Sequence, residues 1–334
     1  MSKIRKLYFY DKKQALEMIS FLNNGADNYV NYIMFNPLIL FHHLIPLKYK
    51  FMPESYIYKD GKEIKGLITI APQKGLNKKV EIKKLFFEEN ALDAAAELVQ
   101  YAVSKYKAMG SPSILVKVDD YLPELLNMFM TKCGFSQISN EKLWRVKDFP
   151  QAEGDKKEFY PCRTFRNSDA KAITELYNDS LLPHFRPLLS CGESEFQEPI
   201  FSGLSYYSEY KYTIFDKNTG NINGCLFIQT SDDENYVLDI MLDGFANYDI
   251  NSLIAFAVDK IKLRSKRFGL FVRSKKYTNM GEEFERIFAE SGYECVQNQI
   301  VLTNSSARVL HSEENAHKYT ILTDFCPSNA VSAS

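Results

Sequence analysis

Glycine is scarce in this sequence, with 15 residues among 334. Loops that cradle phosphate groups usually need glycine, because it lets backbone N–H groups approach the anion closely. The sequence also contains no P-loop, no G-x-G-x-x-G fingerprint and no G-x-S-x-G nucleophile elbow. These absences argue against the nucleotide-binding and hydrolase classes that such motifs define.

Clustered cysteine and long apolar runs are missing as well. None of the six cysteines forms a C-x-x-C pair or stands at metal-ligand spacing from a histidine. The richest apolar stretch, Tyr32 to Phe41, is interrupted by Asn36 and Pro37, and the first residues lack the apolar segment of a signal peptide. We therefore expect a cytoplasmic protein with reduced thiols, no metal and no membrane contact.

The charge balance favours no polyanionic partner. The net charge is −1, so no overall field draws the chain toward nucleic acid. Eight basic residues gather between Lys260 and Lys276, but such a cluster at a helix C-terminus is typical of a solvated face. We expect no nucleic-acid partner.

The sequence does contain enough apolar residues for two cores. Apolar residues make up 45% of its 334 residues, including 24 Phe and 21 Tyr. The polar segment Lys147 to Lys157 carries Pro and Gly and separates two patterned halves. We expect domains over 1–146 and 158–304, a linker at 147–157 and a partly disordered C-terminal extension at 305–334.

The two halves show the same order of predicted elements, which indicates an internal repeat. A central strand ends at Phe87 and at Leu242, and the first apolar anchor well inside the next helix, Leu98 or Leu253, lies eleven residues later in both halves. A later helix stops at Gly134 and at Gly292, each followed by an aromatic residue. Final strands, at 137–146 and 296–303, are expected to close the first and the second half, respectively.

Several segments resemble the GNAT N-acetyltransferase fold. CRTFRNSDAKAITELYN (Cys162 to Asn178) is similar to the opening strand and helix of these domains, and VEIKKLFFEENALDAAAELVQYAV (Val80 to Val103) to their central strand and cofactor helix. FMTKCGF (Phe129 to Phe135) and FAESGY (Phe288 to Tyr293) resemble their later helix ending in Gly-Phe. The resemblance implies an α/β (α+β) fold of two tandem GNAT-like domains, each a mixed, mostly antiparallel twisted sheet flanked by helices.

The resemblance also implies acetyl-CoA or another acyl-CoA as cofactor, held between two parallel strands with its pyrophosphate at the start of the next helix. In the first half the implied cofactor-binding residues are Leu85, Phe86, Phe87, Asn90, Ala94 and Ala95. The glycines of the family's phosphate loop are absent from both halves. Acidic residues stand there instead, Glu88, Glu89 and Asp93 in the first half and Asp243 and Asp249 in the second. Acids complement a helix dipole but repel pyrophosphate.

The family's general base is often a Glu on the central strand, and Glu81 is the best match, with Tyr236 at the matching position of the second half. Half-burial would raise the pKa of Glu81 and suit it to deprotonate an amine. Alternatively, Glu81 is a solvated residue on an alternating strand. The family's Tyr acid is replaced by Met130 and Phe288, neither of which donates a proton.

The connection from His184 to Leu204 corresponds to the region that helps form the family's acceptor pocket. His184, Arg186, Cys191 and Glu195 are the pocket candidates, and an ordinary surface loop is the alternative. The pair His42-His43 is poorly placed for shared ligation on a helix and predicts a core or interface position.

Two functions remain open. One is an acyl-CoA-dependent N-acyltransferase that modifies a small-molecule amine or a protein amine. The other is a catalytically inactive GNAT-fold pseudoenzyme that binds a protein partner, or pairs as a homodimer, as a binding or scaffolding module.

Overall fold

The computed structural model describes residues 3–19, 24–35, 53–72, 79–88, 90–150, 161–198, 208–216, 219–244 and 248–305. The pair His42-His43, most of the expected linker and nearly all of the expected C-terminal extension lie outside these residues. Among the described residues, no helix is long and apolar enough to cross a membrane.

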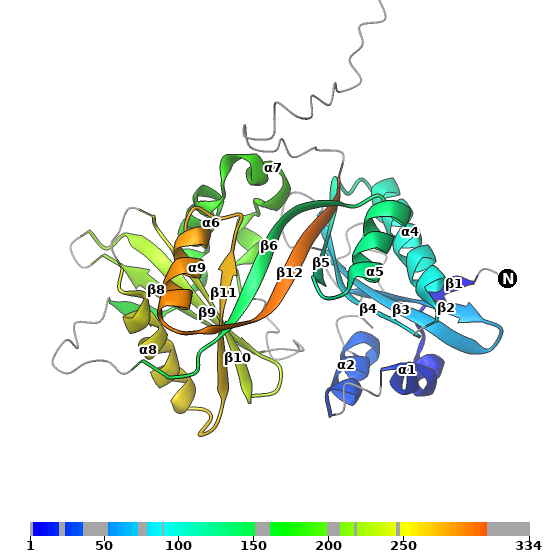
Figure 1. Cartoon of the computed structure of the whole chain (residues 1–334), viewed down its shortest axis with the longest axis horizontal. Coiled ribbons are helices and arrows are strands. Elements are labelled where there is room, and N and C mark those ends of the chain that lie inside the picture. Colours follow the sequence, from blue (N-terminus) through cyan, green and yellow to red (C-terminus); the bar gives the residue numbers. More distant parts are fainter. Residues whose placement is uncertain are drawn as a thin grey trace, which may run out of the picture.

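The described residues form one continuous sheet of 12 strands, in the order β1-β2-β3-β4-β5-β12-β6-β11-β10-β9-β8-β7 (Figure 1). The first half supplies β1 (Ile4–Lys6), α1 (Lys12–Met18), α2 (Asn24–Phe35), β2 (Glu54–Asp60), β3 (Glu63–Pro72), β4 (Val80–Phe87), α4 (Leu92–Ala108), β5 (Ser113–Asp119), α5 (Pro123–Asn127), a π-helical turn at Met128–Lys132, and β6 (Ser136–Arg145).

The second half repeats this order. It supplies β7 (Cys162–Thr164), α6 (Ala170–Ser180), α7 (Arg186–Leu189), β8 (Ser208–Phe215), β9 (Ile222–Thr230), β10 (Asn235–Leu242), α8 (Ile250–Lys262), β11 (Gly269–Lys275), α9 (Gly281–Glu290) and β12 (Glu294–Ser305). The predicted tandem fold is therefore confirmed.

An Arg–Asp pair with a buried aspartate opens each half and marks the repeat more clearly than the aligned glycines do. Arg5 donates two hydrogen bonds to Asp11, at 2.8 and 2.7 Å. Arg163 makes the same pair of bonds to Asp169, both at 2.7 Å. Each aspartate also accepts a backbone N–H three residues before it, so it fixes the turn between the opening strand and its helix.

The last strands of the two halves are exchanged. The expectation that 137–146 closes the first half and 296–303 the second is wrong, because β12 lies between β5 and β6, and β6 lies between β12 and β11. Lys117 of β5 faces Val301 of β12, and Arg273 of β11 faces Leu143 of β6. Each half therefore completes the sheet of the other.

The parallel strands of each half diverge after a short ladder. Strands β4 and β5 pair only from Val80 to Ile82, and β10 and β11 pair only from Asn235 to Asp239. Beyond these points the described strands leave an opening in the sheet. In the second half, α6 packs on one face of the sheet, and α8 and α9 pack on the other.

Candidate functional site

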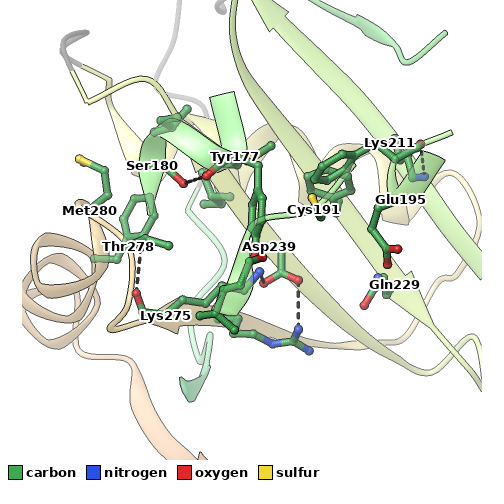
Figure 2. Close-up of a pocket in the computed structure, with 18 of the residues that line it drawn as sticks. Tyr177, Ser180, Cys191, Glu195, Lys211, Gln229, Asp239, Lys275, Thr278 and Met280 are labelled. Carbon is green, nitrogen blue, oxygen red and sulfur yellow. Dashed lines mark hydrogen bonds and ion pairs between the residues drawn. The ribbon is translucent and has the colours of Figure 1, made fainter. Parts of the chain in front are cut away.

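A cavity of about 240 Å³ lies at the opening between β10 and β11 (Figure 2). Successive residues of a strand point to opposite faces of the sheet, and both faces contribute to this cavity. Asp239 and Met241 come from the face covered by α6, whereas Ile240 and Leu242 come from the face covered by α8 and α9. The cavity therefore passes through the sheet.

The cavity floor is a row of side chains in register across four strands. Lys211 of β8 pairs with Phe227 of β9, which pairs with Asp239 of β10, which pairs with Arg273 of β11. The walls come from α6, the segment after it, the connection from β11 to α9 and the start of α9. They contribute Tyr177, Ser180, Leu189, Cys191, Glu195, Phe196, Thr278, Asn279, Met280 and Phe284.

Asp239 is a buried carboxylate at the point where β10 and β11 separate. Its residue is 8% exposed, and its oxygens lie 3.1 Å from Arg273 Nη1 and 3.3 Å from Lys275 Nζ. Burial acts to raise the pKa of Asp239, but the two cations outweigh it and hold the pKa below its ordinary value. Asp239 is therefore ionised and fixed, which suits orientation more than proton transfer.

A second acidic group lies at the other end of the cavity. Glu209 accepts a hydrogen bond from Gln229 at 2.6 Å and pairs with Lys211 at 2.9 Å. Figure 2 shows Glu195 beside Gln229, away from Lys275. These carboxylates suit the binding of a positively charged group such as an ammonium.

Tyr177 and Cys191 supply neutral groups to the wall. Burial raises the pKa of the Tyr177 hydroxyl well above its ordinary value, so the hydroxyl is neutral and acts as a hydrogen-bond donor rather than as an acid. Burial, helped by Glu195, raises the pKa of the Cys191 thiol to about 12. This thiol is protonated at neutral pH and is a poor nucleophile.

The predicted pocket residues are only partly brought together. Glu195 and Cys191 line the cavity, but His184 and Arg186 are not among its lining residues. The Arg186 guanidinium instead donates to the carbonyls of Leu181 and Asp179, and the His184 ring packs on Phe185 with centroids 4.0 Å apart.

The predicted raised pKa of Glu81 is wrong. Its side chain is 16% exposed, and burial acts to raise the pKa. Lys83, at 2.5 Å, and Lys117 outweigh that effect, so the pKa lies below its ordinary value and Glu81 is a weak base. In the parallel ladders, Glu81 pairs with Leu115, and Val237 pairs with Phe271. The structural counterpart of Glu81 in the second half is therefore Val237 and not Tyr236.

The implied cofactor residues of the first half mostly pack in its cores. Phe86 is 8% exposed and packs against Tyr29, while Leu85 and Phe87 pack on the cluster that holds α4. Ala94 and Ala95 are buried within the first turns of α4, and the Ala95 N–H bonds to the carbonyl of Ala91. Asn90 alone of this set is exposed.

The opening between β10 and β11 suits an acyl-pantetheine arm. The start of α8, where the GNAT fold usually holds the diphosphate of CoA, does not suit a diphosphate. The ladder from β11 ends at Asp239, so it leaves the backbone from Ile240 to Leu242 without partners on β11. At the start of α8, the Asp249 carboxylate already accepts the Asn251 N–H at 3.1 Å and the Ser252 hydroxyl. A carboxylate there repels a phosphate anion. Among the described residues, no group of His, Cys, Asp and Glu is arranged to hold a metal.

Comparison with solved structures identifies the fold. A tandem GNAT protein from the clavulanic acid biosynthesis pathway matches with a TM-score of 0.61 at 12% identity, over 91% of this chain and 98% of that one. A GCN5-related N-acetyltransferase from Sphaerobacter thermophilus matches with a TM-score of 0.57 at 11% identity, over 92% and 96%. A Drosophila protein matches with a TM-score of 0.54 at 12% identity, over 91% and 98%. The chain therefore has the fold of the tandem GNAT proteins.

No protein-family model and no curated protein matches this chain.

The sequence did not lead us to predict Asp239, Arg273 and Tyr177 as residues of the site. A signal for the first was present, because Asp239 is the one charged residue in the otherwise apolar segment Val237 to Leu242. A lone acid inside a buried strand needs a buried cation, and Arg273 and Lys275 follow on the next parallel strand. Tyr177 had no signal, because the segment that covers it lacks a recognisable period.

Proposed function

We propose that this protein is an N-acyltransferase that moves an acyl group from a pantetheine thioester, such as acetyl-CoA, to a small amine in the cavity of the second half. The observation that carries this proposal is the cavity that passes through the sheet between β10 and β11. A donor arm entering from the α8 and α9 face and an acceptor entering from the α6 face would meet there.

The side chains of the cavity supply what amine acylation requires. The carboxylate of Glu195 would hold the acceptor's ammonium and take its proton, so that the free amine attacks. The bound thioester supplies the activated acyl group. As the new C–N bond forms and the C–S bond breaks, the acylated nitrogen would release its second proton to the departing sulfur, which the neutral Tyr177 hydroxyl would hold by a hydrogen bond. Asp239, with its two cations, would keep the floor of the cavity in place.

The size of the cavity favours a small acceptor amine. Its volume of about 240 Å³ lies below the roughly 300–1,000 Å³ of pockets for drug-sized ligands. Cytoplasmic location and homodimer formation stay predictions.

A matched pair of substitutions tests the proposal. Ile240 lines the cavity, and Leu85 is its counterpart in the first half, two residues before the strand ends at Phe87. By calorimetry, the wild type should bind acetyl-CoA more tightly than about 100 μM, or roughly −5.5 kcal/mol. Ile240→Trp should weaken binding at least tenfold, whereas Leu85→Trp should bind as the wild type does.

Absence of binding to the wild type at millimolar acetyl-CoA would refute the proposal. The reverse pattern, with binding lost only in Leu85→Trp, would move the donor site to the first half. Thiol release with a panel of small primary amines, compared with a lysine peptide, then identifies the acceptor class.

A binding module without catalysis is the second candidate, and the carboxylate at the start of α8 favours it. On this alternative the cavity takes a small cationic ligand and no thioester. Binding of small amines together with no response to acetyl-CoA or acetyl-pantetheine would support it.

A further inference from the structure

The first half contacts two walls of the cavity in the second half. The segment from Leu181 to Leu188, which follows α6, packs in one apolar cluster with Leu115, Ile138 and Val301 of the central strands. Two of these, Leu115 and Ile138, belong to the first half. We call residues 181–196 the cover of the cavity. The cover therefore packs on the first half as well as on its own sheet.

Lys79 holds the same cover through a polar contact. It immediately precedes β4, is 3% exposed, and donates a hydrogen bond of 2.7 Å to the carbonyl of Ser190. Ser190 is followed by Cys191, whose backbone N–H and carbonyl are both bonded to the side chain of Asn178. The lysine thus fixes one point of the segment that carries Cys191 and Glu195 into the cavity.

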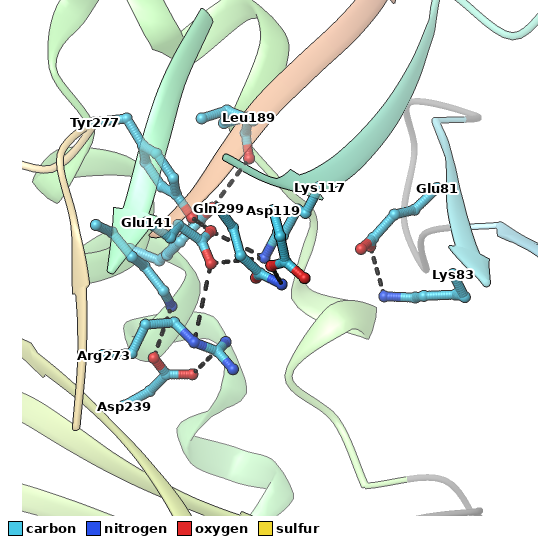
Figure 3. A network of polar contacts seen from close by, with 12 residues as sticks. Glu81, Lys83, Lys117, Asp119, Glu141, Leu189, Asp239, Arg273, Tyr277 and Gln299 are labelled. Atoms are coloured by element: carbon cyan, nitrogen blue, oxygen red, sulfur yellow. Dashed lines mark hydrogen bonds and ion pairs between the residues drawn. The ribbon is translucent and has the colours of Figure 1, made fainter. Parts of the chain in front are cut away.

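Glu141 holds the opposite wall. This residue of β6 is 2% exposed and accepts the Tyr277 hydroxyl at 2.6 Å and Lys117 at 2.9 Å, with Arg273 Nε at 3.9 Å (Figure 3). Arg273 in turn pairs with Asp239 on the floor. The backbone carbonyl of Tyr277 accepts the N–H of Leu182 at 3.1 Å, so Glu141 also acts on the cover.

The strand exchange explains why a first-half residue reaches this place. Because β6 lies between β12 and β11, Glu141 is paired with Lys275 of β11 on one side and with Gln299 of β12 on the other. Without the exchange, β11 would have no neighbour from the first half. Gln299 of β12 occupies the position that corresponds to Glu141 by pseudo-symmetry. Its amide donates a hydrogen bond to Asp119 at 3.2 Å, so this position carries a carboxylate in β6 but not in β12.

We propose that the first half is a positioning scaffold for the site of the second half, with Lys79 and Glu141 as positioning residues. This inference rests on the proposed function in placing the reaction in that cavity. It assigns a role to the duplicated half, whose own implied cofactor residues mostly pack in cores.

Hydrogen–deuterium exchange of the ligand-free full chain tests the scaffold directly. In Lys79→Met and Glu141→Gln, exchange in peptides covering 181–196 and 273–284 should rise at least tenfold. Lys79→Arg should restore slow exchange. Tyr277→Phe, which removes only one hydrogen bond to Glu141, provides a milder variant should Glu141→Gln fail to fold.

Glu54→Gln is the matched control. Glu54 is another buried carboxylate of the first half, 4% exposed, and it accepts hydrogen bonds from Tyr56 and Tyr106 and contacts Lys105 at 3.3 Å. These partners all belong to the first half, so this change should leave exchange at 181–196 as in the wild type. Wild-type exchange of the cavity peptides in Lys79→Met and Tyr277→Phe, or an equal rise in Glu54→Gln, would overturn the inference.

Kinetics separate positioning from simple loss of folded protein. Once an amine substrate is found, Tyr277→Phe and Lys79→Met should raise its KM at least fivefold and leave the KM for acetyl-CoA unchanged. A smaller folded fraction would lower kcat and leave both KM values unchanged, contradicting the assigned role. Failure of the wild type to bind acetyl-CoA would refute the proposed function, but it would not alter the exchange result.

Discussion

At the scale of single residues, Lys79 is the clearest case of a buried charge that lowers folding stability at neutral pH. Burial lowers its pKa from 10.5 to about 8. The unfolded chain keeps this proton up to about pH 10.5, whereas the folded protein releases it near pH 8. Between these values the unfolded state binds more protons, so the contribution of Lys79 to folding stability becomes more favourable as pH rises.

Urea denaturation of the wild type and Lys79→Met at pH 7.5 and pH 10 measures this contribution. The difference between their unfolding free energies should move in favour of the wild type at the higher pH, by on the order of 2 kcal/mol. A difference that does not change with pH would mean that Lys79 is solvated in the folded protein.

Single residues also show which properties of the site could be predicted from the sequence. The prediction that Glu195 belongs to the pocket rested on the resemblance, and the structure places it on the cavity wall. The sequence did not show the pKa direction of Glu81, because Lys117 is 36 residues away in the chain and adjacent in the sheet. Electrostatic effects depend on distances that only the fold sets.

At the scale of elements, one glycine in each hairpin lies where its neighbours leave little room for a side chain. A Cβ on Gly66 would lie 2.8 Å from the end of Leu98, a flexible side chain. A Cβ on Gly224 would lie 2.8 Å from Leu242 and 2.9 Å from the backbone oxygen of Met241. Because backbone yields less than a side chain, Gly224→Ala should cost about 1–3 kcal/mol and Gly66→Ala less.

Thermal or urea unfolding of the two alanine variants measures this difference. Equal losses would show that the Met241 carbonyl moves as freely as a leucine methyl. The same comparison reports on the cavity, since Met241 and Leu242 line it.

The start of α8 carries a prediction about the donor. Because the Asp249 carboxylate already occupies the helix N-terminus, the diphosphate of CoA should add little affinity. Acetyl-pantetheine and acetyl-CoA should therefore bind within about threefold of one another, and Asp249→Asn should favour acetyl-CoA selectively. A preference for acetyl-CoA above tenfold in the wild type would show that the diphosphate is held elsewhere.

The ends of the central strands at Phe87 and Leu242, and the helices that stop before Gly134 and Gly292, followed from periodicity and glycine punctuation. The positions of β6 and β12 did not, because the sequence indicates that each segment is a strand but not whether it lies beside β5 or β11. Local sequence fixes that a strand forms, and long-range pairing decides which edge it meets.

At the scale of the whole molecule, the exchange makes each half incomplete. A fragment of residues 1–150 loses β12 from the edge of β5, and its β6 loses both neighbours. Unpaired edges associate. We expect this fragment to form a homodimer in which the β6 strand of one copy takes the place of β12 beside β5 of the other.

Size-exclusion chromatography with light scattering measures the mass of the fragment. A stable folded monomer would show that β6 can turn back onto its own β5, which would make the exchange dispensable. Coexpression with residues 151–334 should convert the homodimer into a complex of the two fragments.

The central claim is that acyl transfer takes place where β10 and β11 part. A crystal structure of the full chain with a non-hydrolysable acetyl-CoA analogue tests it most directly. The account predicts the acyl group between Ile240 and Arg273, on the cavity side of Tyr177. Density for the analogue between β4 and β5, with none in the second half, would contradict it.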